Sequence, residues 1–328
     1  MNALSPWFLT VQKILNENDI KPLIEQVSLG YTFGIFSLKD SLWVTVTYPR
    51  GYRISFCLAY SPNDKLEITR RSKSDTGIKL FINSSIGHYK TEIQLPAPDC
   101  PVLRYTTTLT PATPLLFPFW PRDIVPLAGP VRKNLPEGKI IVNQVGARSG
   151  QLYFNITQPE AGSVLYHQNL TALANYNQDT ETSAAGTVGG IWPEIGFALP
   201  PTLKQKPLQA RKDYVLNDAF VTFSEELPAD EAAMTRQYLD MLADIYLAIP
   251  KPSVPYIHWP DILSKGLKDL IDSPECWSQL DGHRYFNAYI SDYETPPEIM
   301  EVNAANLMPD SAVAHQLYDQ QKPAEGRH

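Results

Sequence analysis

The chain has 328 residues, of which 43% are hydrophobic and 19% are charged, and its formal net charge is −7 with a pI near 5.4. This length and composition indicate a globular protein with room for two domains. The acidic balance argues against a nucleic-acid partner, because nucleic-acid binders usually carry a concentrated basic face. No stretch approaches the ~20 apolar residues of a membrane span, and residues 1–18 lack the pattern of a signal peptide, so we expect no membrane partner.

Cysteine and histidine usage narrows the compartment and the chemistry. The three cysteines, Cys57, Cys100 and Cys276, lie far apart and form no CxxC pair. This pattern is typical of reduced, partly buried thiols in a cytoplasmic protein. The six histidines are dispersed, with no pair at the helical spacing of metal ligands. We therefore expect a cytoplasmic protein with no metal site and no cofactor.

Residues 1–227 predict an antiparallel β-sandwich that follows a short N-terminal helix. Ser5 and Pro6 provide a helix cap and a first-turn proline. From Leu29 onward the hydrophobic period changes to two, and turn residues separate the apolar runs. Short strands at this spacing favour a sandwich over alternating βαβ units. The predicted strands include 31–36, 42–48, 52–60, 78–82, 89–95, 103–109, 139–145, 150–157, 163–169 and 218–223.

Two long segments and one basic cluster fall between these strands. The proline-rich, aromatic segment 111–136 is predicted to lie across the sandwich as a connection with buried rings. Segment 175–201 reads as a long irregular loop, and loops of that length in a compact domain tend to be functional or disordered. Its aromatic residues argue against disorder. Arg70, Arg71 and Lys73 read as a solvated strand end or loop.

From Pro228 the sequence changes to helical periodicity. Segment 228–249 predicts a helix with one apolar face, which Pro250 ends. A second helix is predicted to begin at Trp259, and Thr295 caps a third. We therefore expect residues 228–328 to form a helical domain.

Acidic side chains mixed with aromatic rings indicate a sugar site in two stretches, 175–194 and 281–294. Glycoside hydrolysis needs two carboxyl groups at the scissile bond, one protonated and one ionised. Aromatic faces supply stacking surfaces, and amides and acids supply hydrogen bonds to hydroxyls. The candidate catalytic residues are Glu194, Asp292 and Glu294. The candidate substrate-binding residues are Asn175, Asp179, Glu181, Trp192, His283 and Tyr289.

Several sequence blocks also resemble a known family. They are the NLTAL run from Asn169, the ETS run from Glu181, the GGIWPEIGF run from Gly189 and the segment 281–298. Together and in this order they are similar to the six-hairpin glycosidase-like proteins, in which an N-terminal β-sandwich packs against an (α/α)6 toroid whose mouth holds the substrate. The resemblance implies an α+β chain, with an antiparallel sandwich followed by the start of such a toroid, and a glycoside-hydrolase-like activity on carbohydrate.

Two functions stay open at this point. Six helical hairpins need roughly 30 residues each, so residues 228–328 predict either an incomplete toroid, in a chain that is inactive alone, or a small helical appendage to the sandwich. The first function is a glycoside-hydrolase-like protein that acts on or binds carbohydrate through paired carboxylates. The alternative is a non-catalytic sandwich that binds carbohydrate or protein. Catalysis requires two carboxyl groups across one pocket, ~5–5.5 Å apart for retention or ~6.5–9.5 Å for inversion.

Overall fold

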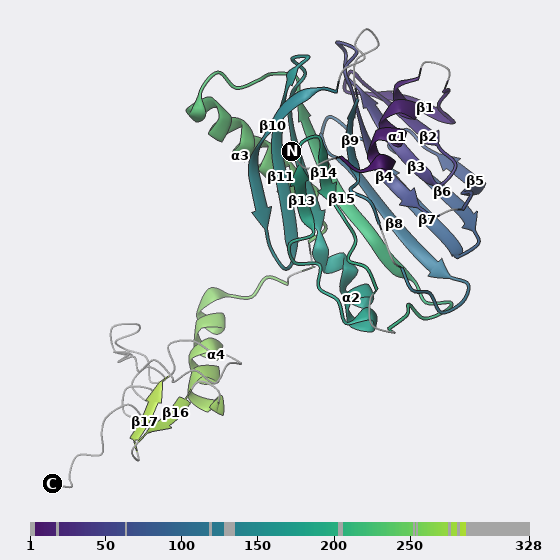
Figure 1. Cartoon of the computed structure of the whole chain (residues 1–328). Helices are drawn as coiled ribbons and strands as arrows, with labels where there is room; N and C mark the ends of the chain where they lie inside the picture. The colour runs from purple at the N-terminus through teal and green to yellow at the C-terminus, as the bar shows by residue number, and fades with distance from the viewer. Residues whose placement is uncertain are drawn as a thin grey trace, which may run out of the picture. The chain divides into compact units, whose positions relative to one another are not determined.

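The computed structural model describes residues 4–17, 20–62, 64–117, 120–127, 135–202, 206–251, 253, 255–274, 277–280 and 283–286. The chain divides into two compact units, Met1–Pro250 and Lys251–His328 (Figure 1). The first unit therefore includes the long helix that follows the last strand of the sandwich. Each unit is described by itself.

Two antiparallel sheets form the first unit (Figure 1). Sheet A has the order β1-β2-β3-β4-β9-β14-β13, and sheet B has the order β10-β11-β12-β15-β8-β7-β6-β5. The strands of sheet A are β1 (Ile24–Ser28), β2 (Tyr31–Ser37), β3 (Ser41–Thr47), β4 (Arg53–Tyr60), β9 (Ile124–Leu127), β13 (Val188–Ile191) and β14 (Glu194–Phe197). The strands of sheet B are β5 (Glu67–Lys73), β6 (Gly77–Ser84), β7 (Gly87–Gln94), β8 (Leu103–Pro111), β10 (Glu137–Val145), β11 (Ser149–Gln158), β12 (Gly162–Asn169) and β15 (Tyr214–Ser224).

The sheets face each other, and side chains of alternating residues fill the space between them. In β8 every second residue from Leu103 to Leu109 is buried, and the residues between them point away from the core. Tyr105 of β8 lies with its ring centroid 6.0 Å from that of Phe56 in β4. Burying a large apolar side chain contributes about 1.5–3 kcal/mol, and one continuous core joins both sheets. The predicted antiparallel sandwich is confirmed.

Helix α1 (Pro6–Asn16) covers the outer face of sheet A. The Ser5 hydroxyl accepts a hydrogen bond from the N–H of Phe8 at 3.2 Å, as a helix cap does. The Trp7 ring packs 5.7 Å from the ring of Trp43. Because both faces of the sheet are covered, β3 and β4 are buried almost throughout instead of alternating.

Helix α3 (Glu231–Ala248) covers one half of the outer face of sheet B (Figure 1). Its Met241 and Ile245 are buried against Tyr153 of β11 and Phe220 of β15. Among the described residues no helix lies over β5–β8, so the outward side chains of these strands are accessible. The two halves of one sheet face therefore differ in packing.

One carboxyl group lies fully inside the core, between the sheets. The Asp123 Oδ2 atom accepts hydrogen bonds from the hydroxyls of Tyr105 at 3.0 Å and Tyr166 at 2.7 Å, and from Asn217 Nδ2 at 3.3 Å. Its Oδ1 atom accepts from the N–H of Phe197 at 2.7 Å. Since Tyr105, Tyr166 and Asn217 belong to sheet B and Phe197 to sheet A, this cluster joins the two layers.

Long side chains bridge the edge strands of the two sheets, β1 and β5. Arg71 Nη1 donates to the carbonyl of Leu23 at 3.2 Å, and Lys73 Nζ donates to the carbonyl of Glu25 at 3.0 Å. Gln26 reaches back from β1 and donates to carbonyls in the turn between β5 and β6. The basic cluster predicted as a solvated strand end or loop is thus the exposed edge strand β5.

Two segments hold more regular structure than the sequence predicted. The aromatic rings of segment 111–136 are buried as expected at Phe117 and Trp120. The segment is not only a connection, because β9 lies inside sheet A between β4 and β14. Segment 175–201 follows a 3-10 turn (Leu170–Leu173) and contains most of helix α2 (Ala174–Thr180) and the β13–β14 hairpin. The prediction of a long irregular loop over segment 175–201 is therefore wrong.

The expected start of an (α/α)6 toroid is also wrong. The described residues contain four α-helices, and α3 buries its apolar face on sheet B instead of on another helix. In the second unit, α4 (Trp259–Asp272) is followed by a hairpin of β16 (Trp277–Leu280) and β17 (His283–Phe286). The helix expected after Thr295 lies outside the described residues. None of the described helices has the length and hydropathy needed to cross a bilayer.

Candidate functional site

The first predicted stretch supplies acids that are held by neighbouring cations. Asp179 on α2 accepts from Lys212 Nζ at 2.7 Å and from the Tyr214 hydroxyl at 2.5 Å. These bonds, that of Lys212 first, hold the pKa of Asp179 below its usual value. Glu181 ends α2 with a left-handed backbone and pairs with Lys206 at 2.9 Å. These contacts join α2 to segments near β15.

Asn175 of α2 and the residues of the β13–β14 hairpin have different surroundings. Asn175 is exposed. Trp192 donates from Nε1 to the Pro136 carbonyl at 2.9 Å and packs its ring against Phe154, so the ring anchors the hairpin. Glu194 accepts from the N–H of Ser5 at 2.9 Å and from its hydroxyl at 2.6 Å. The Glu194 carboxylate therefore fixes the residue that caps α1.

The second predicted stretch lies in the other unit. His283 begins β17, of which the structure describes the backbone path. Tyr289, Asp292 and Glu294 lie outside the described residues. That the acids of the two stretches share one pocket therefore stays a prediction.

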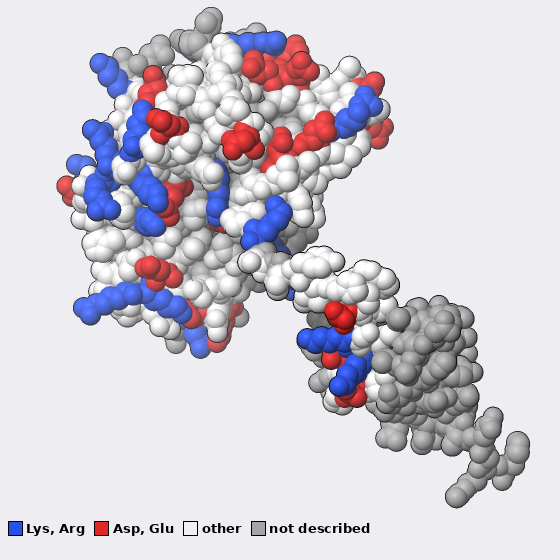
Figure 2. Space-filling model, turned by 180° about the vertical axis from the view of Figure 1, so that it is seen from behind, with Lys and Arg blue, Asp and Glu red and all other residues white. Residues whose placement is uncertain are grey.

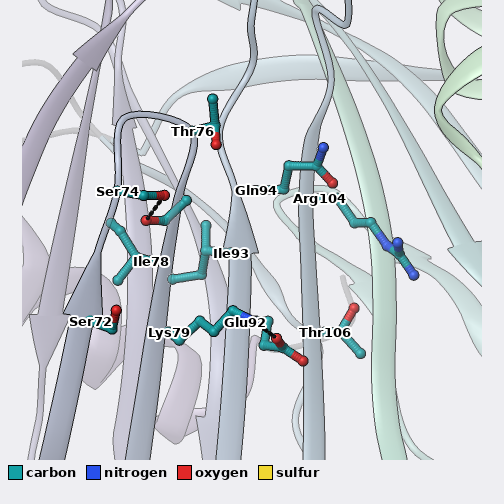
Figure 3. A pocket seen from close by; sticks show the side chains of 11 residues that line it. Ser72, Ser74, Thr76, Ile78, Lys79, Glu92, Ile93, Gln94, Arg104 and Thr106 are labelled. Atoms are coloured by element: carbon teal, nitrogen blue, oxygen red, sulfur yellow. Dashed lines mark hydrogen bonds and ion pairs between the residues drawn. The ribbon is translucent and has the colours of Figure 1, made fainter.

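A hollow of about 520 Å³ opens on the outer face of sheet B, over β5–β8 (Figure 3). Strand register explains its composition, because Lys79 lies opposite Glu92, and Glu92 lies opposite Thr106 on the next strand. Successive residues of a strand point to opposite faces, so these three side chains share the outer one. We call this hollow the outer-face pocket. Its lining residues are Ser72, Ser74, Thr76, Gly77, Ile78, Lys79, Glu92, Ile93, Gln94, Arg104 and Thr106.

The carboxylate in the outer-face pocket is held by two ammonium groups. Glu92 pairs with Lys79 and with Lys90, each at 2.7 Å. The hydrogen bond from Lys79 and then that from Lys90 lower the pKa of Glu92 from its ordinary value. Glu92 is therefore a stable anion and hydrogen-bond acceptor at neutral pH.

The wall of the pocket next to β15 is fixed by a second carboxylate, Asp218. Arg104 makes a two-point contact with it, Nε to Oδ1 at 2.9 Å and Nη2 to Oδ2 at 3.3 Å. Thr106 and Asn169 also donate to Asp218, at 2.9 and 2.8 Å. Because a planar guanidinium is held at two points, Arg104 keeps one orientation. The guanidinium also lies 4.9 Å from the centre of the Phe220 ring.

Three polar side chains in the outer-face pocket make no hydrogen bond to the described residues. They are Ser72, Thr76 and Gln94, all exposed. A hydroxyl can donate and accept, and an amide carries both kinds of group. Together with the charged atoms of Lys79 and Glu92, they offer donors and acceptors side by side. This arrangement suits a ligand that is rich in hydroxyl groups.

Asp123, whose raised pKa would suit a general acid, lies in the core and not in the outer-face pocket. Burial raises the pKa of Asp123 to about 6, against hydrogen bonds that lower it. Its side chain is 0% exposed, so a substrate cannot reach it. No group of three or more His, Cys, Asp or Glu side chains in the described part of the chain could hold a metal ion.

Sequence reasoning missed the outer-face pocket because its residues are dispersed over four strands. The available signal was the alternation of polar residues, as in Lys90, Glu92 and Gln94 or in Arg104 and Thr106. That alternation predicts an outward face, but it does not reveal which strands are neighbours.

Comparison with known proteins adds little to this geometry. No protein-family model matches the chain, and no curated protein matches it. Among solved structures, it is similar to one described as "Active YidC insertase crystal structure with the first transmembrane domain resolved". The identity is 10%, over 81% of this chain and 56% of that chain, and the TM-score is 0.22. A score that low supports no conclusion about fold or function.

Proposed function

We propose that the chain is a carbohydrate-binding β-sandwich protein that holds its ligand in the outer-face pocket without cleaving it. The supporting observation is the pocket itself, where Ser72, Thr76 and Gln94 offer unengaged hydroxyl and amide groups beside Lys79 and Glu92. Sugars present many hydroxyls that both donate and accept. A small number of convergent polar groups is what orients a ligand of this kind.

Binding is favoured over hydrolysis by the state of the carboxyl groups. Hydrolysis of a glycoside needs one protonated and one ionised carboxyl at the bond. In the pocket, the pKa of Glu92 is lowered, so it cannot hold a proton at neutral pH. Asp218 behind the pocket accepts from three side chains and lies 4% exposed. The described pocket therefore has acceptors but no general acid.

The test is the binding of hexasaccharides of glucose, galactose and galacturonate to the full chain, measured by calorimetry. Gln94→Ala removes a side chain without a hydrogen-bond partner, so folding is preserved while affinity falls about fivefold, the equivalent of one hydrogen bond of about 1 kcal/mol. Ser72→Trp fills the hollow and is expected to weaken binding by more than about tenfold.

Asn175→Trp is the matched control, because it adds the same ring at an exposed position of α2. Its affinity should equal that of the wild type. Loss of binding in Asn175→Trp but not in Ser72→Trp would move the site to the stretch around α2. Release of reducing sugar by the wild type would show that the protein is an enzyme and overturn the non-catalytic proposal.

A cytoplasmic location is part of the proposal. Cys57 and Cys100 are free thiols in the described residues. Burial raises the pKa of the Cys57 thiol, which keeps it protonated and slow to react. Such thiols suit a reducing compartment. Fractionation of the producing cells, with the protein found outside the cytoplasm, would contradict this location.

A further inference from the structure

Positive charge gathers on strands β5–β8 of a chain that is acidic as a whole. These four strands contain six Lys or Arg residues and two Glu, while the formal net charge of the chain is −7. Figure 2 shows Lys and Arg side chains gathered on the side of the molecule that carries these strands. The six cations are Arg70, Arg71, Lys73, Lys79, Lys90 and Arg104.

Two carboxylates pair with three of these six cations. Lys79 and Lys90 share the single carboxylate of Glu92, which leaves one positive charge in excess. Arg104 is balanced by Asp218. The outer-face pocket therefore carries a net positive charge even where its ion pairs are complete.

The other three cations lie on β5 and have no carboxylate partner among the described residues. Arg71 and Lys73 donate to backbone carbonyls, which carry no charge. Arg70 places its guanidinium 4.2 Å from the centre of the Phe81 ring. Ser72, between them, lines the pocket. Arg70, two residues from Ser72, lies on the same outer face, whereas Arg71 and Lys73 pair with the core residues Leu80 and Ile78 and point to the opposite face, toward β1.

We infer that the outer-face pocket selects an acidic carbohydrate, one that carries uronic acid carboxylates among its hydroxyl groups. This inference rests on the proposed function and names the ligand class. The uncompensated Arg70 and the excess charge of Lys79 and Lys90 over Glu92 attract the ligand's negative charge, and Lys79 is the cation inside the pocket itself. Glu92 and Gln94 accept hydrogen bonds from its hydroxyls.

The same residues disfavour nucleic acid as the ligand. None of the lining residues is aromatic, so the pocket offers no ring on which a base could stack. Glu92 repels phosphate and uronate carboxylate alike and accepts a bond from a hydroxyl, of which a uronic acid unit carries more than a deoxynucleotide. A polyol with a few carboxylates can pair its carboxylates with the cations and donate its hydroxyls to Glu92.

The experiment compares galacturonate hexasaccharide with its fully methyl-esterified form, which has the same rings and hydroxyls but no charge. The full chain should bind the acid form about tenfold more tightly at low salt, and 0.5 M NaCl should erase the difference. The variant Arg70→Gln/Lys79→Gln/Lys90→Gln should lose this preference, since each glutamine keeps an amide donor and loses the charge of a cation on the pocket's face. The matched control Lys13→Gln/Lys139→Gln/Arg236→Gln removes three exposed cations outside β5–β8 and should keep the preference.

Each other outcome overturns a different statement. Equal affinity of the wild type for both hexasaccharides, lost in Ser72→Trp, leaves the carbohydrate proposal in place and refutes the charge selection. Absence of binding to both forms refutes the proposed function and the inference with it. Tighter binding of a single-stranded oligodeoxynucleotide than of galacturonate, lost in the variant Arg70→Gln/Lys79→Gln/Lys90→Gln, shows that the basic strands serve nucleic acid and refutes the acidic sugar.

Discussion

Two carboxylate clusters lie on opposite faces of sheet B, and they differ in the donors that surround the carboxylate. Asp123 lies in the core with neutral donors, including the hydroxyl of Tyr105, and its pKa is raised to about 6. Glu92 lies on the outer face with two ammonium donors, and its pKa is lowered. Tyr105 and Arg104 are neighbours on β8 and serve opposite faces. Neutral donors do not offset full burial, whereas cations stabilise an anion even at the surface.

This comparison supports the proposal that the protein binds its ligand without acid catalysis. A general acid must have a raised pKa and must also touch the substrate. In the described residues, Asp123 has the raised pKa and no access, while Glu92 has the access and a lowered pKa. The raised pKa and the access to a ligand therefore belong to two different carboxyl groups, on opposite faces of sheet B.

The largest expected effect comes from removing the inner carboxylate. Asp123→Ala leaves the donors of Tyr105, Asn217 and the Phe197 N–H buried without an acceptor, at about 1–3 kcal/mol each before relaxation, while the Tyr166 hydroxyl keeps Gln168 as an acceptor. We expect a loss of about 3–5 kcal/mol in the free energy of unfolding, measured by urea denaturation. Glu92→Ala removes two exposed ion pairs and should cost at most about 1 kcal/mol. Similar losses for the two variants would show that the contrast between the faces is wrong.

The second effect is a dependence of stability on pH. Because the folded pKa of Asp123 lies above the unfolded value, its favourable contribution is complete below ~3.8 and is lost as pH rises through about 6. The shift of about two units corresponds to at most about 3 kcal/mol. His167 has a lowered pKa through burial and acts in the opposite direction. Unfolding free energies at pH 5 and pH 7 should therefore be compared with those of Asp123→Asn, which lacks the titrating group.

Wild type should gain stability on acidification relative to Asp123→Asn across this interval. The variant itself is expected to be less stable at both pH values, because an amide has one acceptor oxygen where the carboxylate has two. Parallel pH profiles for the two proteins would mean that Asp123 keeps an ordinary pKa in the fold.

A smaller effect is expected at the cap of α1. Glu194→Gln replaces a charged acceptor of the Ser5 hydroxyl and N–H by an amide and should lower the unfolding free energy by about 1 kcal/mol. Sugar affinity should not change. Glu181→Gln, at an exposed ion pair, serves as the control and should stay within about 0.5 kcal/mol of wild type. Unchanged stability together with lost affinity would assign Glu194 to ligand binding.

The smallest effect concerns the outer cluster. Lys79→Gln removes the main cause of the lowered pKa of Glu92, so the pKa should move up toward the ordinary value for a glutamate. The stability change should stay below about 1 kcal/mol, because both side chains are exposed. A carboxylate titration followed by NMR measures the pKa. Lys90→Gln should give a smaller shift in the same direction, and no shift in either variant would show that the cations do not hold Glu92.

The sequence predicted most of the sandwich because its strands alternate strongly. The run from Leu103 to Leu109 shows this period and forms β8 as expected. β9 escaped prediction because it has four residues, includes Pro126 and is defined by its partners β4 and β14. The helix 228–249 was recognised as α3, but the surface that its apolar face covers is a property of the fold.

The candidate site was harder to predict than the fold. Glu194 and Asp179 have the residue type of catalytic acids, but their roles depend on Ser5 and Lys212, which lie 189 and 33 residues away in sequence. Lys79 and Glu92 form one site only because the register of β6 and β7 places them opposite each other. Composition reveals which groups are present, and strand pairing decides which of them meet.

The bridges between β1 and β5 also affect how this protein behaves in a concentrated solution. An unprotected edge strand is a template to which another chain can add, and such addition leads to aggregation. Here the carbonyls of Leu23 and Glu25 already accept from Arg71 and Lys73, and two cationic side chains lie across the gap. An incoming strand would have to displace them and bury their charge. The open side of the sandwich is thereby guarded against edge-to-edge polymerisation.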